Sequence, residues 1–172
     1  DWTVSVTTDD DTFHINAVRK ASESNTGDGR TSDGSTTDKY ITDLSKAESQ
    51  VVSLDTFALI LAENATKDVI IKSNNNVTFT FAKGTMASVD GKTEYDFSTS
   101  IVNAYADTMP SYITKDNFVS QINYNYSGKL PATANIRFYA GTEYAGQTLY
   151  YSLMNADNTF AEVQAVVVDA DG

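Results

Sequence analysis

Apolar and polar residues alternate over short stretches along most of this 172-residue chain, and a period of two predicts β-strands. Residues 2–6 and 13–17 alternate on either side of the acidic triplet Asp9-Asp10-Asp11, which predicts a hairpin. Later alternations and apolar runs predict further strands at 68–72, 77–81, 95–102, 121–126, 132–139, 148–154 and 160–168. Turn-forming Gly, Asn and Asp residues separate these stretches, so most of the chain is predicted to be extended.

One stretch, residues 53–64, has the spacing of a helix instead. Ser53 can cap its first turn, Asp55 lies where a carboxylate favours the helix N-terminus, and Asn64 can end it. These residues predict a helix over 54–63. A second short helix is predicted to begin near Thr114, whose side chain could cap it.

The order of these elements predicts a mostly β fold. Short strands at regular turn spacing are typical of a β-sandwich, Ig-like or jelly-roll-like, here with one or two short helices. Residues 22–38 consist almost wholly of small polar residues and predict a long polar loop or a linker. The length suits a single β-rich module spanning residues 1–172.

Charge and composition narrow the function. The net charge is −11 and the 12 Lys and Arg residues are scattered, which argues against a nucleic-acid partner or an anionic membrane surface. No apolar run approaches the roughly 18 residues that membrane insertion requires. The chain has no cysteine, so disulfides, thiolate metal sites and cysteine nucleophiles are excluded.

Candidate metal ligands are few. His14 is the only histidine, so a transition-metal site is not expected. The carboxylates of Asp9-Asp10-Asp11, of Asp28 and Asp33, and of Asp169-Ala170-Asp171-Gly172 could serve calcium, but none has the spacing of a complete calcium loop. The expectation is therefore no cofactor, with a structural calcium ion left open.

Catalytic groups are not evident either. Glycoside hydrolysis needs two carboxylates facing each other across a cleft, and Glu94, Glu143 and Glu162 show no such pairing in the sequence. The isolated His14 has no accompanying Gly-x-Ser-x-Gly motif for a serine triad. The chain is predicted not to be an enzyme.

The last four predicted strands offer a candidate binding face. Strand parity directs one set of residues toward the core, including Tyr151 on its strand and Val163, Ala165 and Val167 on the next. If these strands pair in meander order, the other face carries two tyrosines for stacking and polar groups for hydroxyls. The predicted ligand-binding residues are Tyr139, Tyr150, Arg137, Asn123, Asn125 and Gln164. An ordinary solvent face of a tyrosine-rich sheet has the same composition, so both interpretations stay open.

Three runs in this part of the chain carry a resemblance: SGKLPATA at 127–134, YAGQTLYYSLMN at 144–155 and VVDADG at 167–172. They resemble a β-rich accessory module of large secreted and cell-surface proteins of clostridia and ruminococci. The resemblance covers about residues 51–172 and carries no catalytic residues over. It implies an extracellular or cell-surface location beside neighbouring modules of the same polypeptide, such as glycoside hydrolases, dockerins and Ig-like repeats. The chain also begins and ends abruptly, as a piece of a longer polypeptide would.

Together these observations predict a non-catalytic extracellular module that binds plant or dietary polysaccharide by aromatic stacking. The alternative is a structural spacer or adhesion domain of a multimodular bacterial surface protein. The exposure of Tyr139 and Tyr150 discriminates between them, because stacking on sugars requires open rings.

Overall fold

The structure of the chain is a computed structural model, and it describes residues 2–9, 12–19, 38–106, 113–126, 129–154 and 160–172. Within these residues the protein is mainly β, with twelve strands, one α-helix and one short 3₁₀ helix, η1 (Thr142–Tyr144). The mostly β prediction is confirmed. Of the predicted polar loop 22–38, residues 22–37 lie outside the described part of the chain, as do Asp10 and Asp11 of the acidic triplet.

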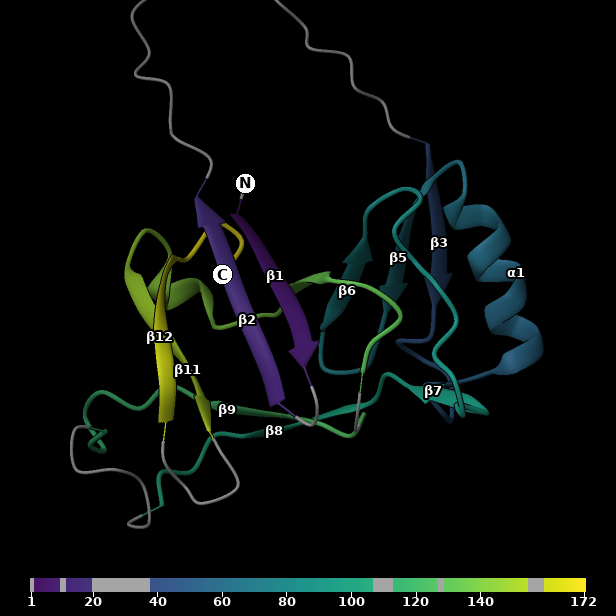
Figure 1. The fold of residues 1–172 in the computed structure, drawn as a ribbon. Coiled ribbons are helices and arrows are strands. Elements are labelled where there is room, and N and C mark those ends of the chain that lie inside the picture. Colours follow the sequence, from purple (N-terminus) through teal and green to yellow (C-terminus); the bar gives the residue numbers. More distant parts are fainter. Residues whose placement is uncertain (1, 10–11, 20–37, 107–112, 127–128, 155–159) are drawn as a thin grey trace, which may run out of the picture.

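The largest unit is a six-stranded sheet of order β2-β1-β10-β6-β5-β3 (Figure 1). Its strands are β2 (Thr12–Arg19), β1 (Trp2–Asp9), β10 (Ala134–Arg137), β6 (Thr78–Phe81), β5 (Asp68–Lys72) and β3 (Lys39–Asp43). The predicted N-terminal hairpin is confirmed, with Trp2 opposite Arg19 and Asp9 opposite Thr12. Neighbours are antiparallel except β3 and β5, which are parallel.

The parallel pair follows from the helix between its strands. Parallel neighbours need a long crossover, and α1 (Leu54–Asn64) supplies it between β3 and β5. The predicted cap is confirmed, because Ser53 Oγ accepts a hydrogen bond from Thr56 N at 3.4 Å. The helix buries Phe57, Ile60 and Asn64. The predicted helix is therefore present and ends one residue later than expected.

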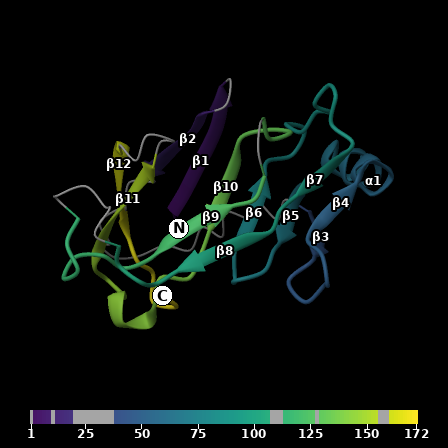
Figure 2. The ribbon, with the colours of Figure 1, turned by 90° about the horizontal axis from the view of Figure 1, so that it is seen from below.

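Three two-stranded pairs complete the fold: β4 (Val51–Ser53) with β7 (Glu94–Asp96), β8 (Thr99–Val102) with β9 (Gln121–Tyr124), and β11 (Thr148–Met154) with β12 (Phe160–Val167). Figure 2 shows β8 and β9 running crosswise to β10, β6 and β5. The predicted strand 95–102 is in fact two strands. The chain bends between them, where Ser98 N donates to Asp96 Oδ1 at 2.8 Å.

One face of the six-stranded sheet packs on the core. Val69, Ile71 and Phe81 are fully buried there, in one cluster with residues of α1, β4 and β7. Aromatic rings connect the layers. The Phe57 and Tyr95 rings stack with 4.1 Å between their centroids, and the Phe79 and Phe97 rings also contact each other. Such ring pairs add to the stability that burial provides.

The other face of the sheet, called the open face below, has no fully buried side chain between β3 and β10. Its residues alternate with the core positions and are Lys39, Ile41, Asp43, Asp68, Ile70, Lys72, Thr78, Thr80, Asn135 and Arg137. Ile41 is 53% exposed at the sheet edge. This face is where side chains are available to a ligand.

The predicted second helix near Thr114 is absent from the described segment 113–126. Thr114 O accepts hydrogen bonds from both Asn117 N and Phe118 N, which closes a single helical turn. The expected cap is reversed, since Thr114 N donates to Asn117 Oδ1 at 2.6 Å. A single turn without further i, i+4 bonds does not propagate into a helix.

Candidate ligand pocket on the open face of the sheet

A row of charged and hydroxyl side chains crosses the open face. Asp43 pairs with Lys72 across β3 and β5, Lys72 with Thr78 across β5 and β6, and Thr78 with Arg137 across β6 and β10. Directly paired residues of neighbouring strands place their side chains on the same face, about 5 Å apart. The strand register therefore aligns these four residues from the sheet edge to its centre.

The C-terminal segment lies beside one end of this row. Arg137 Nη2 donates to Asp169 Oδ2 at 2.9 Å and lies 3.6 Å from Asp171 Oδ2. Ala140 N donates to Gly172 O at 3.1 Å, which holds the segment beside the end of β10. The two carboxylates and the backbone bond fix the segment next to Arg137.

Tyr139 lies two residues beyond Arg137 and is 48% exposed. Its hydroxyl oxygen accepts a hydrogen bond from Thr142 N at 3.3 Å. The ring borders Gly172, where an added Cβ would come within 2.7 Å of the ring carbon Cε2. Phe138 packs against the core cluster, and the centroid of its ring lies 5.6 Å from that of the Tyr151 ring. The Tyr139 ring is thus held from two sides while part of it faces solvent.

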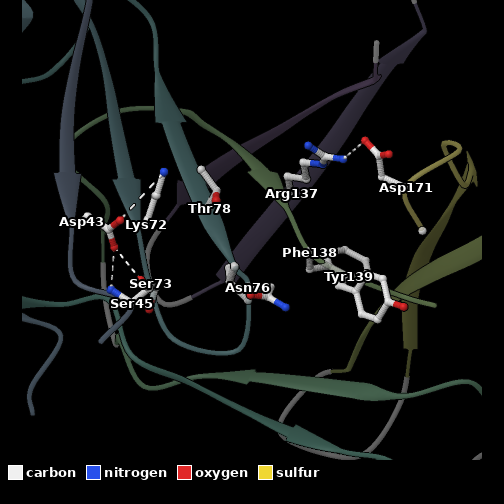
Figure 3. A pocket seen from close by; sticks show the side chains of 12 residues that line it. Asp43, Ser45, Lys72, Ser73, Asn76, Thr78, Arg137, Phe138, Tyr139 and Asp171 are labelled. Carbon is white, nitrogen blue, oxygen red and sulfur yellow. Dashed lines mark hydrogen bonds and ion pairs between the residues drawn. The ribbon is translucent and has the colours of Figure 1, made fainter. Parts of the chain in front are cut away.

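These elements surround a pocket of about 380 Å³ (Figure 3). In Figure 3 the aromatic side chains lie toward one end, Asp43 and Lys72 toward the other, and Asn76 and Thr78 between them. The lining residues are Asp43, Ser45, Lys72, Ser73, Asn76, Val77, Thr78, Arg137, Phe138, Tyr139, Asp171 and Gly172. The pocket combines one exposed aromatic ring with hydrogen-bond donors and acceptors.

The charges in the pocket are balanced, with two cations and two carboxylates. Lys72 Nζ lies 3.9 Å from Asp43 Oδ2, and Arg137 lies beside Asp171. Hydrogen bonds from the Ser45 hydroxyl and backbone N–H lower the pKa of Asp43, so that it stays an acceptor at neutral pH. All four groups are substantially exposed, and exposed ion pairs are weak enough to exchange for contacts with a ligand.

A tight turn places Asn76 at the pocket. Val77 N donates to Asn74 O at 3.1 Å, and the two central residues, Asn75 and Asn76, have φ of 56° and 58°. Positive φ at both central positions is the type I′ hairpin turn, which asparagine tolerates well. Asn74 links this turn to β8, because its Nδ2 donates to Thr99 O and its Oδ1 accepts from Thr99 N.

Of the six predicted ligand residues, the structure brings only Arg137 and Tyr139 into this pocket. Tyr150 is 71% exposed but lies on β11, in the separate β11–β12 pair. Gln164 pairs with Tyr151 rather than with Tyr150, so it lies on the opposite face from Tyr150. The predicted parity of β12 is wrong: Ala165, expected in the core, is the exposed partner of Tyr150.

Asn123 and Asn125 also lie elsewhere. β9 pairs with β8, and these two amides make hydrogen bonds to Ser100 Oγ and Ser98 Oγ across that pair. The expected meander of the last four strands is therefore wrong. β10 instead lies between β1 and β6, and the single flat patch of six residues does not form. Burial of Ala134 and Ile136 against the core places β10 in the large sheet.

Sequence reasoning missed most of the pocket. Asp43 belongs to β3, which was not predicted; Tyr40, Ile41 and Thr42 are residue types that favour strands, but the residues of β3 do not alternate in polarity. Lys72 and Thr78 lie on predicted strands but were not recognised as site residues. The strand-favouring residue types at 40–42 were available in the sequence, whereas the pairing of β5, β6 and β10 was not.

Comparisons with known proteins give no relative. No protein-family model matches the chain, and neither the curated proteins nor the solved structures contain a significant match. Among the described residues no three His, Cys, Asp or Glu side chains are grouped to hold a metal ion. No helix in that part of the chain has the length and apolar character needed to cross a membrane. The resemblance to accessory modules stays a prediction from the sequence motifs.

Proposed function

We propose that this chain is a non-catalytic module that binds a polysaccharide in the open-face pocket, with Tyr139 as the stacking ring. The observation that carries the proposal is the half-exposed, hydrogen-bonded Tyr139 ring at the end of a pocket lined mostly by hydrogen-bonding groups. The apolar faces of sugar rings pack on aromatic rings, while their hydroxyls need both donors and acceptors.

Preorganisation supports this role for Tyr139. A ligand that binds a flexible side chain loses affinity to the cost of ordering it. Here the Thr142 N–H, the contact with Gly172 and the packing of Phe138 on Tyr151 fix the ring and its strand end before any ligand arrives. Arg137 donates a hydrogen bond to Asp169 at 2.9 Å. The pocket can therefore bind with little reorganisation.

The module belongs, in this proposal, to an extracellular or cell-surface protein that meets plant or dietary polysaccharide. The sequence motifs support this context. For the fold we propose a β-sandwich of the Ig-like or jelly-roll-like kind. The packing of one sheet face against α1, β4 and β7 supports a layered arrangement.

Affinity gel electrophoresis tests the proposal, with the chain run through gels containing starch, xylan, xyloglucan, β-glucan, mannan or pectin. Retardation by at least one polysaccharide is expected, and Tyr139→Ala weakens it about tenfold, since losing a well-packed ring contact costs roughly 1.4 kcal/mol. Tyr150→Ala is the matched control, because Tyr150 is more exposed yet does not line the pocket.

Three outcomes are informative. Loss of retardation in Tyr139→Ala alone supports the pocket. Loss in Tyr150→Ala alone contradicts this site, although the chain would still be a sugar-binding module. No retardation in any gel contradicts the function itself and favours the structural spacer or adhesion domain. Circular dichroism of each variant confirms that the fold is unchanged.

A further inference from the structure

We infer that the pocket takes an internal stretch of an extended, uncharged polysaccharide that runs across the strands, from the β3 edge to the C-terminal segment. This inference rests on the proposed function and adds to it the direction of the chain, its charge and the number of sugar units bound. It follows from the strand register, the charge balance and the two open ends of the pocket.

The strand register sets the direction of the bound polysaccharide and the number of its sugar units that contact the row. The paired residues Asp43, Lys72, Thr78 and Arg137 belong to four successive strands, β3, β5, β6 and β10. Neighbouring strands are about 4.8 Å apart, so three spacings span about 14 Å. One spacing is close to the length of a sugar unit in an extended polysaccharide. A chain crossing the strands would meet one side chain of the row at about each sugar, over three sugars.

Both ends of the row are open. At one end, β3 is the edge strand of the sheet, and Asp43 lies on it with about half of its side chain exposed. At the other end, the Asp171 side chain is 87% exposed. Within the described residues no strand pairs beyond β3 to block the passage of a chain. A polysaccharide could continue past either end, so the site suits chain interiors rather than chain ends.

The charges select an uncharged chain. Lys72 and Arg137 each have a carboxylate beside them, Asp43 and Asp171 respectively. A uronate carboxylate entering the pocket would therefore gain no unopposed cation, and the net charge of −11 repels a polyanion. Neutral hydroxyls lose nothing by this balance, because they accept from Lys72 and Arg137 and donate to the carboxylates.

Isothermal titration calorimetry with oligosaccharides of known length tests the inference. The probes are cello-, xylo-, manno- and malto-oligosaccharides of two to six units, with oligogalacturonates of the same lengths. For at least one neutral series, the affinity should rise up to about three units and then level off. The oligogalacturonates should bind at least tenfold more weakly than that series.

A variant at the far end of the row separates this inference from the proposed function. Lys72→Met should weaken binding of oligosaccharides of three or more units about threefold, but leave the two-unit ligand at Tyr139 unchanged. The matched control is Lys83→Met, because Lys83 is also exposed and does not line the pocket.

Several results would overturn the inference while leaving the proposed function standing. One is an affinity that levels off at two units although Tyr139→Ala still weakens binding about tenfold. Others are a Lys72→Met protein with wild-type affinity at every length, or tighter binding of oligogalacturonates. Failure of the proposed function looks different, because then no polysaccharide retards the unmodified chain.

Discussion

Replacing Asn64 tests how the end of α1 is joined to the loop after β6. Asn64 is 1% exposed, and its side chain makes three hydrogen bonds to backbone groups. Nδ2 donates to Lys67 O at 3.2 Å and to Ala82 O at 3.0 Å, while Oδ1 accepts from Met86 N at 2.9 Å. One amide thus connects the end of the helix with the loop after β6.

The expected cost of Asn64→Ala is about 3 kcal/mol in the free energy of unfolding. Each intramolecular hydrogen bond contributes about 1 kcal/mol net, and three are lost. Met86 is buried, so its N–H has no access to water in the variant, whereas Ala82 is exposed and its carbonyl can be hydrated. Since small domains are stable by about 5–15 kcal/mol, the variant should still fold.

Asn64→Asp gives a second, pH-dependent readout. The substitution keeps the shape of the side chain but replaces the donating Nδ2 with an oxygen opposite the Lys67 and Ala82 carbonyls. The ionised carboxylate is therefore repelled by these carbonyl oxygens and loses hydration. Burial then raises the pKa of the new carboxyl above its usual value of about 3.9. A raised folded-state pKa means that stability is greatest below about pH 4 and falls as the pH rises through the folded-state value.

Urea unfolding followed by circular dichroism measures both effects, at pH 4 and pH 8. Asn125→Ala is the matched control, because Asn125 is exposed and its side-chain amide donates to Ser98 Oγ at 2.8 Å. Its replacement should cost well under 1 kcal/mol. A loss below 1 kcal/mol in Asn64→Ala would refute the reasoning. So would an Asn64→Asp variant whose stability relative to the unmodified chain is the same at both pH values.

Two further predictions follow from local features. Burial raises the pKa of Tyr126 to about 12, above its usual value of 10. The stability that the neutral hydroxyl supports is therefore complete below pH 10 and is lost between about pH 10 and 12. Over that range the urea midpoint should fall less steeply with pH in Tyr126→Phe than in the unmodified chain, and equal slopes would contradict this. Asn76 has a φ of +58°, which glycine adopts freely and a β-branched residue does not. Asn76→Gly should therefore raise the melting temperature slightly or leave it unchanged, while Asn76→Val should lower stability by about 1–2 kcal/mol. A Val variant as stable as the Gly variant in thermal unfolding would exclude backbone strain.

Elements that depend on neighbouring residues were predictable from the sequence. The N-terminal hairpin, α1 with its Ser53 cap, and strand β11 all follow from local period and capping chemistry. The turn at Asn74–Asn76 was predictable for the same reason, since its residues tolerate positive φ. Local rules failed at Thr114, where one helical turn forms without continuing.

Residues of the candidate site were predictable only where the alternation of apolar residues along a strand shows which side chains point outward. Arg137 and Tyr139 follow the apolar residues Ala134, Ile136 and Phe138 in clear alternation, so their outward direction was fixed locally. On β12 the apolar residues occupy both parities, as in Val163, Ala165 and Val166, and the sequence gives no decisive face. Pairing with Tyr151 set the direction of Gln164 instead.

By itself, the sequence determined a mostly β chain with one capped helix, a strongly acidic charge and two outward-facing residues of the pocket. The tertiary structure alone decided that Asp43, Lys72 and Arg137 form one row, because β3, β5 and β10 are far apart in the chain. Strand neighbours and register are chosen by which apolar faces can be buried together. That choice depends on the whole core, and no local period along the chain encodes it.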